Sequence, residues 1–264
     1  MVERIKIIGV PISAVNMESC VEYIFDNWSE AKGNYICVSN VHTTVMAHDD
    51  PCYHRVQSES FLTVPDGKPL SVIGRRKAPM MGRVTGPDLM RRILEESEHR
   101  ELRHFFYGNT QETLQLLINE IRFKYPWVNV VGSEASVFRD MSVEEEEALA
   151  QRIEAQSPDF IWVSLGAPRQ ESFCWRMKGK LSGLMIPVGG AFNVLAGSVP
   201  EAPRWLQECG MEWFYRLIQE PKRLMKRYLV SNTKFIVYFI FGIKAKVERG
   251  IKHENGRDRN LLQG

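Results

Sequence analysis

The sequence predicts an α/β fold with Rossmann-like parallel sheets in two closely packed halves and a helical C-terminal appendage. Apolar runs of strand length alternate with helical patterns over residues 104–200, which is typical of parallel strands joined by right-handed crossovers. Several of these runs end in a glycine just before a helix start. The chain has 264 residues, 44% of them hydrophobic, so it is long enough to form a large core.

The first half, residues 1–103, is expected to be α/β but less regular. Short apolar runs predict its strands, while cap-like Asn or Ser residues and a Gly-Pro-Asp sequence predict its helix starts. The expected elements, in order, are a strand over Ile5–Val10, a helix from Asn16 or Ser19 through Trp28, strands over Tyr35–Ser39 and Phe61–Val64, and a helix that begins at Gly86-Pro87-Asp88.

The second half, residues 104–200, is expected to be the regular Rossmann-like half. Ser142 and Glu145 have the spacing of a capping box, and leucines and isoleucines recur at helical spacing after Thr110. The expected elements are strands over Phe105–Gly108, Val128–Val131, Phe160–Leu165 and Leu184–Val188, with helices from Asn109 or Thr110, from Ser142 to about Ala155, and from Arg169.

One joint in this half, Asp159–Glu171, combines a buried strand, a glycine turn at Gly166 and a helix start near Pro168. A parallel strand that ends in a glycine turn at a helix N-terminus is where α/β proteins bind anionic ligands. Gln170 lies at that helix start. An ordinary strand–turn–helix joint has the same pattern, and this stretch alone supports both interpretations equally.

The appendage, residues 201–252, is predicted to be helical and basic. From Arg204 to Lys252 there are eleven Lys and Arg residues and four acidic residues, a net charge of +7; since the whole chain carries +2, the remainder carries −5. This asymmetry indicates an anionic partner, such as a nucleotide, a phospholipid or a nucleic acid. The polar tail, residues 253–264, is expected to be disordered.

An apolar run over Phe235–Ile243 lies within the appendage and is followed by basic residues. It is too short to cross a bilayer, which needs ~20 apolar residues. One interpretation is contact with an anionic membrane surface. The alternative is an interface in a homo-oligomer or a core helix.

Two strand ends in the first half carry candidate catalytic side chains. Asp66 follows a predicted strand in a Pro-Asp-Gly turn, where a carboxylate is well placed to act as a general base. The local pattern alone favours a simpler role, in which Asp66 bonds its own turn backbone. Asn40 and His42 end another strand, and a lone histidine there more often makes a structural hydrogen bond than acts as a base.

The appendage also supplies three arginines at helical spacing. Arg216, Arg223 and Arg227 share one helical face if Pro221 leaves the helix axis continuous. Such a face could close over a diphosphate, and the alternative is a solvated basic face.

Missing motifs exclude several classes of enzyme. The sequence has no G-x-G-x-x-G fingerprint, no Walker loop and no G-x-S-x-G elbow. No Asp-x-Asp is present and the histidines lack metal-ligand spacing, so neither a metal nor a cofactor is expected, and arginines and helix N-termini would hold any phosphates. The five cysteines are scattered and the N-terminus lacks a signal-peptide core, which indicates a reducing cytoplasm.

Together these motifs resemble the WecG/TagA/CpsF glycosyltransferases, family 26 of the glycosyltransferases. The resemblance covers roughly residues 5–235. It rests on five motifs in the family's order: Pro65-Asp66-Gly67, Arg83 through Leu89, Asp159 through Glu171, Gly189 through Phe192, and Glu212 through Arg227. The resemblance implies a bacterial enzyme of cell-wall or surface polysaccharide synthesis. Such enzymes transfer a sugar, typically of the N-acetylmannosamine type, from a UDP-sugar to an undecaprenyl-diphosphate-linked sugar, with inversion and without a required metal.

The resemblance also implies roles for individual residues. Asp66 matches the proposed catalytic base, and Asn40 and Gln170 match positions that line the catalytic pocket. Arg83 lies beside that pocket. The implied substrate-binding residues are Asn40, Arg83, Gln170, Arg216, Arg223 and Arg227. Among them, the appendage arginines would form a lid that neutralises the charge on the departing UDP. The expected nucleotide-binding residues are Gly108, Val137, Gly166, Gly190, Phe192 and Asn193.

The chain departs from the family pattern at Ser136-Val137-Phe138, where many members have Gly-Tyr-Phe, and at Asn193, where they have aspartate. The implied partners are a UDP-sugar, a polyprenyl-diphosphate-linked acceptor and the inner face of the cell membrane, where the protein would be peripheral. The alternatives are a UDP-hexose donor such as UDP-glucose, and a nucleotide-binding protein without catalysis. Nucleic-acid binding has no recognition motif to support it.

Overall fold

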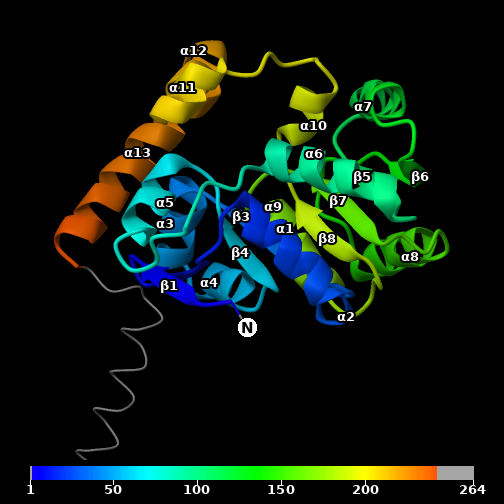
Figure 1. Cartoon of the computed structure of the whole chain (residues 1–264), viewed down its shortest axis with the longest axis horizontal. Coiled ribbons are helices and arrows are strands. Elements are labelled where there is room, and N and C mark those ends of the chain that lie inside the picture. Colours follow the sequence, from blue (N-terminus) through cyan, green and yellow to red (C-terminus); the bar gives the residue numbers. More distant parts are fainter. Residues whose placement is uncertain (1, 243–264) are drawn as a thin grey trace, which may run out of the picture.

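The computed structural model describes residues 2–242, apart from the side chains of Glu208 and Arg223. The predicted disordered tail over residues 253–264 and the last part of the predicted appendage lie outside the described residues. Figure 1 shows strands at the centre of the molecule, helices around them, and the appendage helix α13 along one side.

The strands form two parallel sheets and a hairpin, which confirms the predicted Rossmann-like α/β class. One sheet has the order β6-β5-β7-β8 and the other pairs β3 with β4. A parallel bridge between Tyr35 and Met185 places β3 beside β8, so the two sheets lie edge to edge. The parallel strands are β3 (Ile36–Ser39), β4 (Leu62–Pro65), β5 (Arg103–Gly108), β6 (Asn129–Glu134), β7 (Phe160–Ser164) and β8 (Leu184–Pro187).

Alternate residues of the strands build a hydrophobic core on each face of the sheets. Phe106 and Trp162 point into one core, which is covered by α1 (Met17–Asp26), α6 (Gly86–Glu96), α7 (Gln111–Lys124) and α10 (Ala191–Leu195). Phe105 and Val163 point into the other, which is covered by α4 (Pro51–Ser58), α8 (Val143–Glu154) and α9 (Arg169–Met177). Each core includes residues from both halves, so the halves are packed together as the sequence predicted.

The second half matches its predicted elements closely because its signals are local. Thr110 caps α7 by accepting a hydrogen bond from the Thr113 N–H, and Ser142 and Glu145 form the predicted capping box at α8. Such caps satisfy backbone groups that a helix start leaves unpaired.

The first half differs from the prediction in two places. The single strand expected over Ile5–Val10 is wrong: β1 (Arg4–Ile7) and β2 (Val10–Ser13) form an antiparallel hairpin. The chain turns at Ile8 and Gly9, which both have positive φ. The sequence analysis also missed three helices around the first sheet. These are α3 (Val41–Asp49), α4 and α5 (Lys68–Gly74).

The appendage consists of three helices, α11 (Arg204–Cys209), α12 (Glu212–Gln219) and α13 (Pro221–Ile240). The condition for a shared helical face from Arg216 to Arg227, a continuous axis through Pro221, is not met. Helix α12 ends at Gln219, Glu220 leaves helical geometry with φ −131° and ψ 61°, and Pro221 begins a new helix.

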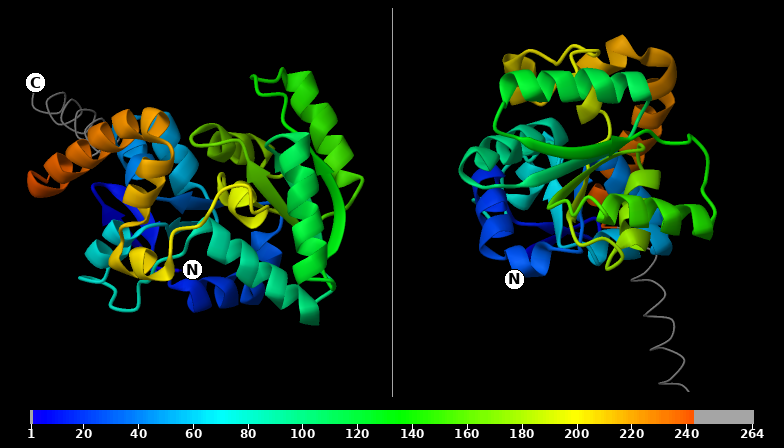
Figure 2. Two further views of the ribbon diagram at one scale, coloured as in Figure 1. Left: turned by 90° about the horizontal axis from the view of Figure 1, so that it is seen from above. Right: turned by 90° about the vertical axis from the view of Figure 1, so that its right-hand side faces the viewer.

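The appendage leaves the second half and docks on the first. Figure 1 shows the segment after α10 crossing to α11 and α12, and the left view of Figure 2 shows α13 (orange) and α7 (green) at opposite ends of the molecule. Helix α13 packs along α3: Asp49 accepts hydrogen bonds from Lys234 Nζ at 2.6 Å and Tyr238 OH at 2.8 Å. This docking brings the appendage to the carboxyl ends of β3 and β4. Over residues 2–242, no helix combines the length and the apolar character needed to cross a bilayer.

Candidate active site

The carboxyl ends of β3 and β4 bring Asn40 and Asp66 together. Ser39 and Pro65 are partners in the parallel register, so the residues that follow them leave the sheet side by side. The Asp66 N–H donates to the Ser39 carbonyl at 2.7 Å, which fixes the turn that carries the carboxylate. The Asp66 side chain therefore points from the edge where ligands bind in open α/β sheets.

Asn40 is oriented by the helix that it caps. Its Oδ1 accepts from the N–H groups of His42 and Thr43, at 3.1 and 3.2 Å, at the start of α3. This leaves the amide nitrogen facing Asp66, with Nδ2 3.5 Å from Oδ2. Because the cap fixes the side-chain oxygen, the amide nitrogen remains the donor toward the carboxylate.

The environment of Asp66 raises its pKa to about 6. Burial is the main cause, because it disfavours the charged carboxylate, and the negative charge of Glu212 adds to it. Arg216, Arg83 and the hydrogen bond from Asn40 act in the opposite direction. A carboxylate with a pKa near neutrality can both accept and release a proton at physiological pH.

Arg83 from the body and Arg216 from α12 meet at Glu212. Arg83 donates to the backbone carbonyl and to the side-chain oxygen of Gln207, both at 3.0 Å, and lies 3.4 Å from Glu212 Oε2. Arg216 donates to Glu212 Oε1 at 2.8 Å. A Cβ added at Gly190 would lie 3.9 Å from Arg216 Nη1, so this guanidinium reaches over the end of β8.

Gln170 ties the turn after β7 to the end of β8. It is 6% exposed, and its Oε1 accepts from the Gly166 N–H at 3.1 Å while its Nε2 donates to Glu171 at 2.9 Å. A Cβ at Gly189, where φ is +52°, would lie 3.2 Å from the same Oε1. Both ends of the Gln170 amide group are thus held by neighbouring residues, and its role in a substrate pocket stays a prediction.

The second arginine of α13, Arg227, reaches the buried side of the site. Burial raises the pKa of the Glu171 carboxyl, and the positive charge of Arg227 partly offsets that rise. It also acts with burial to lower the pKa of His42 to about 4. Nδ1 of His42 lies 2.7 Å from Ser231 Oγ, so His42 makes the structural hydrogen bond that the sequence favoured. The side chain of Arg223 is outside the described part of the structure.

The four-stranded sheet provides a second region, at the point where its strand order reverses. The chain runs from β5 outward to β6 and then crosses to β7 and β8, so the reversal lies between the ends of β5 and β7. Gly108 and Gly166 lie there with φ of +107° and +76°. Asn109 Nδ2 donates to Asn193 Oδ1 at 3.1 Å across the same edge. Such reversal points are the usual ligand sites of open α/β sheets.

The remaining predicted nucleotide residues divide into exposed and buried positions. Val137 is 52% exposed on the loop after β6, beside Phe138, which is 64% exposed. The side chain of Phe192 is fully buried, with its ring centroid 5.9 Å from that of Phe106. Because the whole of Phe192 is enclosed in the core, the structure does not support the expectation that this residue contacts the nucleotide.

Sequence reasoning missed Glu212 as a member of the site, although it begins one of the quoted motifs. Its two arginine partners come from different parts of the chain. Its position at the start of a helix with Arg216 four residues later is a signal of an ion pair, but nothing in the sequence connects it to Arg83.

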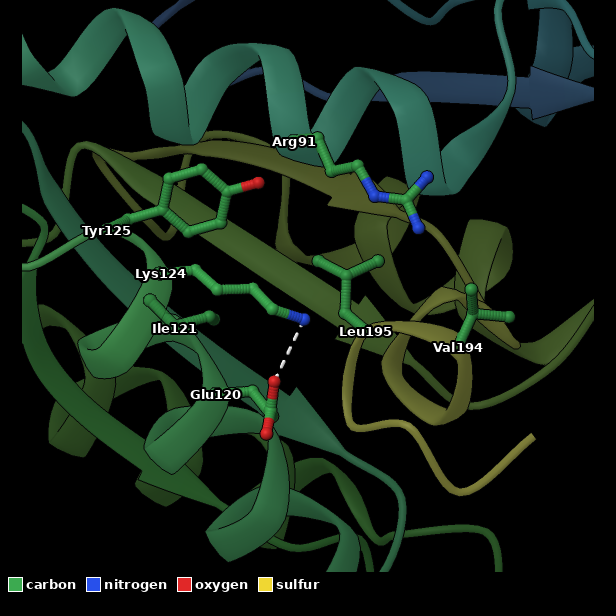
Figure 3. A pocket seen from close by; sticks show the side chains of 7 residues that line it. All are labelled: Arg91, Glu120, Ile121, Lys124, Tyr125, Val194 and Leu195. Atoms are coloured by element: carbon green, nitrogen blue, oxygen red, sulfur yellow. Dashed lines mark ion pairs between the residues drawn. The ribbon is translucent and has the colours of Figure 1, made fainter. Parts of the chain in front are cut away.

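A small cavity lies away from this site, among α6, α7 and α10 (Figure 3). Its charged side chains already have partners within the protein. Arg91 pairs with Glu201 at 2.7 Å, and Lys124 with Glu120 at 2.9 Å. Within residues 2–242, no group of three or more His, Cys, Asp or Glu side chains is arranged to hold a metal ion.

The fold and the site define a Rossmann-like α/β enzyme in which a carboxylate and two arginines meet at the ends of parallel strands. The chain belongs to the WecG/TagA/CpsF family of glycosyl transferases, whose sequence model matches residues 5–249. It is therefore a glycosyltransferase.

Two relatives from Bacillus share one name, N-acetylglucosaminyldiphosphoundecaprenol N-acetyl-beta-D-mannosaminyltransferase. The protein of Bacillus spizizenii is 28% identical over 207 residues, and the match covers 78% of each chain. The protein of Bacillus subtilis is 29% identical over 218 residues, which cover 81% of this chain and 83% of the relative.

Proposed function

We propose that this glycosyltransferase moves a sugar of the N-acetylmannosamine type from a UDP-sugar to an undecaprenyl-diphosphate-linked saccharide, with inversion at the anomeric carbon. The names of the two Bacillus relatives support this choice of transferred sugar and acceptor. The observation that carries the proposal is the half-buried Asp66 carboxylate, which has a pKa near 6 and lies beside Arg83 and Arg216.

In the proposed reaction, Asp66 accepts the proton of the acceptor hydroxyl as that oxygen attacks the anomeric carbon. The bond between the anomeric carbon and the β-phosphate oxygen breaks, and UDP leaves with the bonding electron pair. Arg216 and Arg83 offset the charge that develops on the phosphate, which is the role expected of fixed cations at a leaving group. The proton on Asp66 then returns to solvent.

Each of the three regions of the chain would have a different role in the reaction. Residues 1–103 would carry the base, residues 104–200 would hold the nucleotide, and residues 201–252 would close the site. The nucleotide would lie at the reversal point of the four-stranded sheet. The residues proposed to approach it are Gly108, Val137, Gly166, Gly190 and Asn193, while Asn40 and Gln170 would line the sugar pocket. Arg223 and Arg227 would complete the lid.

The appendage would hold the enzyme on the inner face of the cell membrane as a peripheral protein. Its helices expose large apolar side chains, which supports contact with lipid: Trp205, Phe214, Ile218, Leu229, Ile236, Ile240 and Phe241. Lysines and arginines in the same region would attract anionic headgroups. A homo-oligomer that buries these side chains is the competing explanation for the same surface.

A panel of donors tests the proposal. Purified protein would be incubated with a synthetic acceptor, GlcNAc linked to an undecaprenyl-type diphosphate. Each reaction would also contain one donor: UDP-ManNAc, UDP-GlcNAc or UDP-glucose. The lipid product would be separated by chromatography. We expect extension of the lipid only with UDP-ManNAc. If only UDP-glucose extended the lipid, the donor would be a UDP-hexose and not UDP-ManNAc. The absence of any extension would contradict the proposal.

A further inference from the structure

Glu212 occupies a place where an anion is held between two guanidinium groups. One of its carboxylate oxygens is 2.8 Å from Arg216 Nη2, and the other is 3.4 Å from Arg83 Nη2. Arg83 belongs to the body of the protein, and Arg216 to the appendage. A phosphate group satisfies arginines in the same way, through two oxygens that accept charge-assisted hydrogen bonds.

The two arginines do not depend equally on Glu212. Arg83 is already held by two hydrogen bonds to Gln207. The described partner of Arg216 is Glu212, and Arg216 reaches Gly190 at the end of β8. Arg216 is therefore the guanidinium that an incoming phosphate at this strand end would engage, and it can do so only in competition with the carboxylate.

The Glu212 side chain is 23% exposed, so its carboxylate can turn away from the two arginines into solvent. Partly exposed ion pairs of this kind contribute little to folding stability, because solvent screens them. As the first residue of α12, the carboxylate also favours the helix N-terminus slightly. Neither contribution requires the carboxylate to stay between the two arginines.

We propose that Glu212 is an internal competitor of the sugar donor: its carboxylate holds Arg216 before the donor binds, and the diphosphate displaces the carboxylate on binding. Glu212 is in this sense a positioning residue that sets the affinity of the site for a nucleoside diphosphate. The inference rests on the proposed function, because it takes the ligand to be the diphosphate of a UDP-sugar.

Displacement has a measurable signature in binding. Calorimetric titration with UDP should give roughly three- to tenfold tighter binding to Glu212→Gln than to the wild-type protein, because the competing charge is removed while an amide can still hydrogen-bond the arginines. Glu201→Gln is the matched control. It removes a carboxylate that pairs with Arg91, and Glu201 is not among the groups that act on the pKa of Asp66. The UDP affinity of this variant should equal that of the wild type.

A double-mutant cycle separates displacement from long-range repulsion. In an Arg216→Gln background, Glu212→Gln should improve UDP binding much less, since the guanidinium that remains beside Glu212 is that of Arg83, which Gln207 already holds. If the full gain persists in that background, general repulsion explains it and the proposal is overturned. Equal or weaker UDP binding by Glu212→Gln alone also overturns it.

The pH dependence provides a second readout that a structural role would not change. The charged and polar groups that face Asp66 are Glu212, Arg216, Arg83 and Asn40, with Tyr228 nearby. Removing the negative charge of Glu212 should move the acidic limb of kcat/KM to lower pH, whereas Glu201→Gln should leave it in place. Failure of every variant, including the wild type, to bind UDP would contradict the proposed function itself and the inference with it.

Discussion

At the scale of single residues, the surroundings of Asp66 suit the proposed role of a base. Its carboxylate leaves a parallel strand, is held by a backbone bond to Ser39, and faces the amide nitrogen of Asn40. Burial and Glu212 raise its pKa, while two arginines keep the ionised form accessible. With this pKa, the proposed base is mostly ionised at pH 7 and is still a better proton acceptor than an ordinary aspartate.

The first prediction concerns the pH dependence of turnover. Because Asp66 must be ionised to accept a proton and its pKa is about 6, kcat/KM should fall tenfold per pH unit below about pH 6 and level off above pH 7. A titration of initial rates between pH 4.5 and 8.5 measures this. An acidic limb near pH 4, the value of an unperturbed aspartate, would contradict the described environment.

The second prediction concerns Gly108 at the end of β5. A Cβ there would overlap the carbonyl oxygen of Ser164 and lie 2.7 Å from its carbon, and φ is +107°. Gly108→Ala should lower the free energy of unfolding by about 2–5 kcal/mol, since it adds overlap with backbone to strain.

Gly197→Ala is the matched control for that substitution. Its φ of +72° brings strain, but no heavy atom lies within 4 Å of the added Cβ, so we expect a loss of about 1 kcal/mol. Chemical denaturation of both variants gives the comparison. Equal losses would mean that β5 and β7 do not approach as closely as the structure has them.

At the scale of elements, the docking of α13 on α3 decides where the appendage arginines lie. Asp49 anchors Lys234 and Tyr238, and His42 anchors Ser231, so one side of α13 faces α3. Phe235 is buried on that side, while Ile236 and Ile240 are 55% and 67% exposed. The helix therefore has one face that packs on the body and another that is available to a partner.

The third prediction tests that available face. Ile236→Ser combined with Ile240→Ser should weaken binding to vesicles of anionic phospholipid at least tenfold, since each exposed apolar side chain that enters the interface contributes about 1.5 kcal/mol or more. Co-sedimentation with the vesicles measures the bound fraction.

Phe123→Ser controls for the loss of an exposed apolar side chain. Phe123 is 83% exposed on α7, at the opposite end of the molecule, and its replacement should leave vesicle binding unchanged. If the double variant binds vesicles as well as the wild type does, the exposed face of α13 is not a membrane contact. If the double variant has a different oligomeric state from the wild type, the exposed face of α13 is an interface between copies of the chain.

At the scale of the whole molecule, the parallel sheets, the glycine turns and the caps of the second half could be predicted because their signals lie within a few residues of one another. Helix α3 could not, because its buried positions include the polar residues Thr43, Thr44 and His48, so no apolar stripe marks it. The hairpin at Ile8 and Gly9 was missed because two short strands and a tight turn have the pattern of one longer strand.

The candidate site shows the same division. Asp66, Gly166 and Gln170 could be found because each follows a strand in a recognisable turn. The pairing of Arg83 with Glu212 could not, because it joins positions far apart in the chain through the docking of the appendage. The proline at Pro221 indicates that a new helix starts there, but the sequence does not determine whether the axis of the helix that carries Arg216 continues into the helix that carries Arg227.

The central claim, that Asp66 is the base of a UDP-sugar transferase, is tested most directly by Asp66→Asn. The fold should survive, because a raised pKa means that the charged form of Asp66 destabilises the native state as pH rises from about 4 through about 6. At pH 7.5 the variant should therefore be at least as stable as the wild type, and Asp26→Asn, an exposed aspartate of α1, is the matched control.

The decisive measurement is the rate of sugar transfer to the lipid-diphosphate acceptor by Asp66→Asn, together with its UDP affinity. We expect transfer to fall by roughly 10²–10⁴-fold, while UDP affinity stays close to the wild-type value or rises and Asp26→Asn transfers at the wild-type rate. Near-normal transfer by Asp66→Asn would contradict the claim.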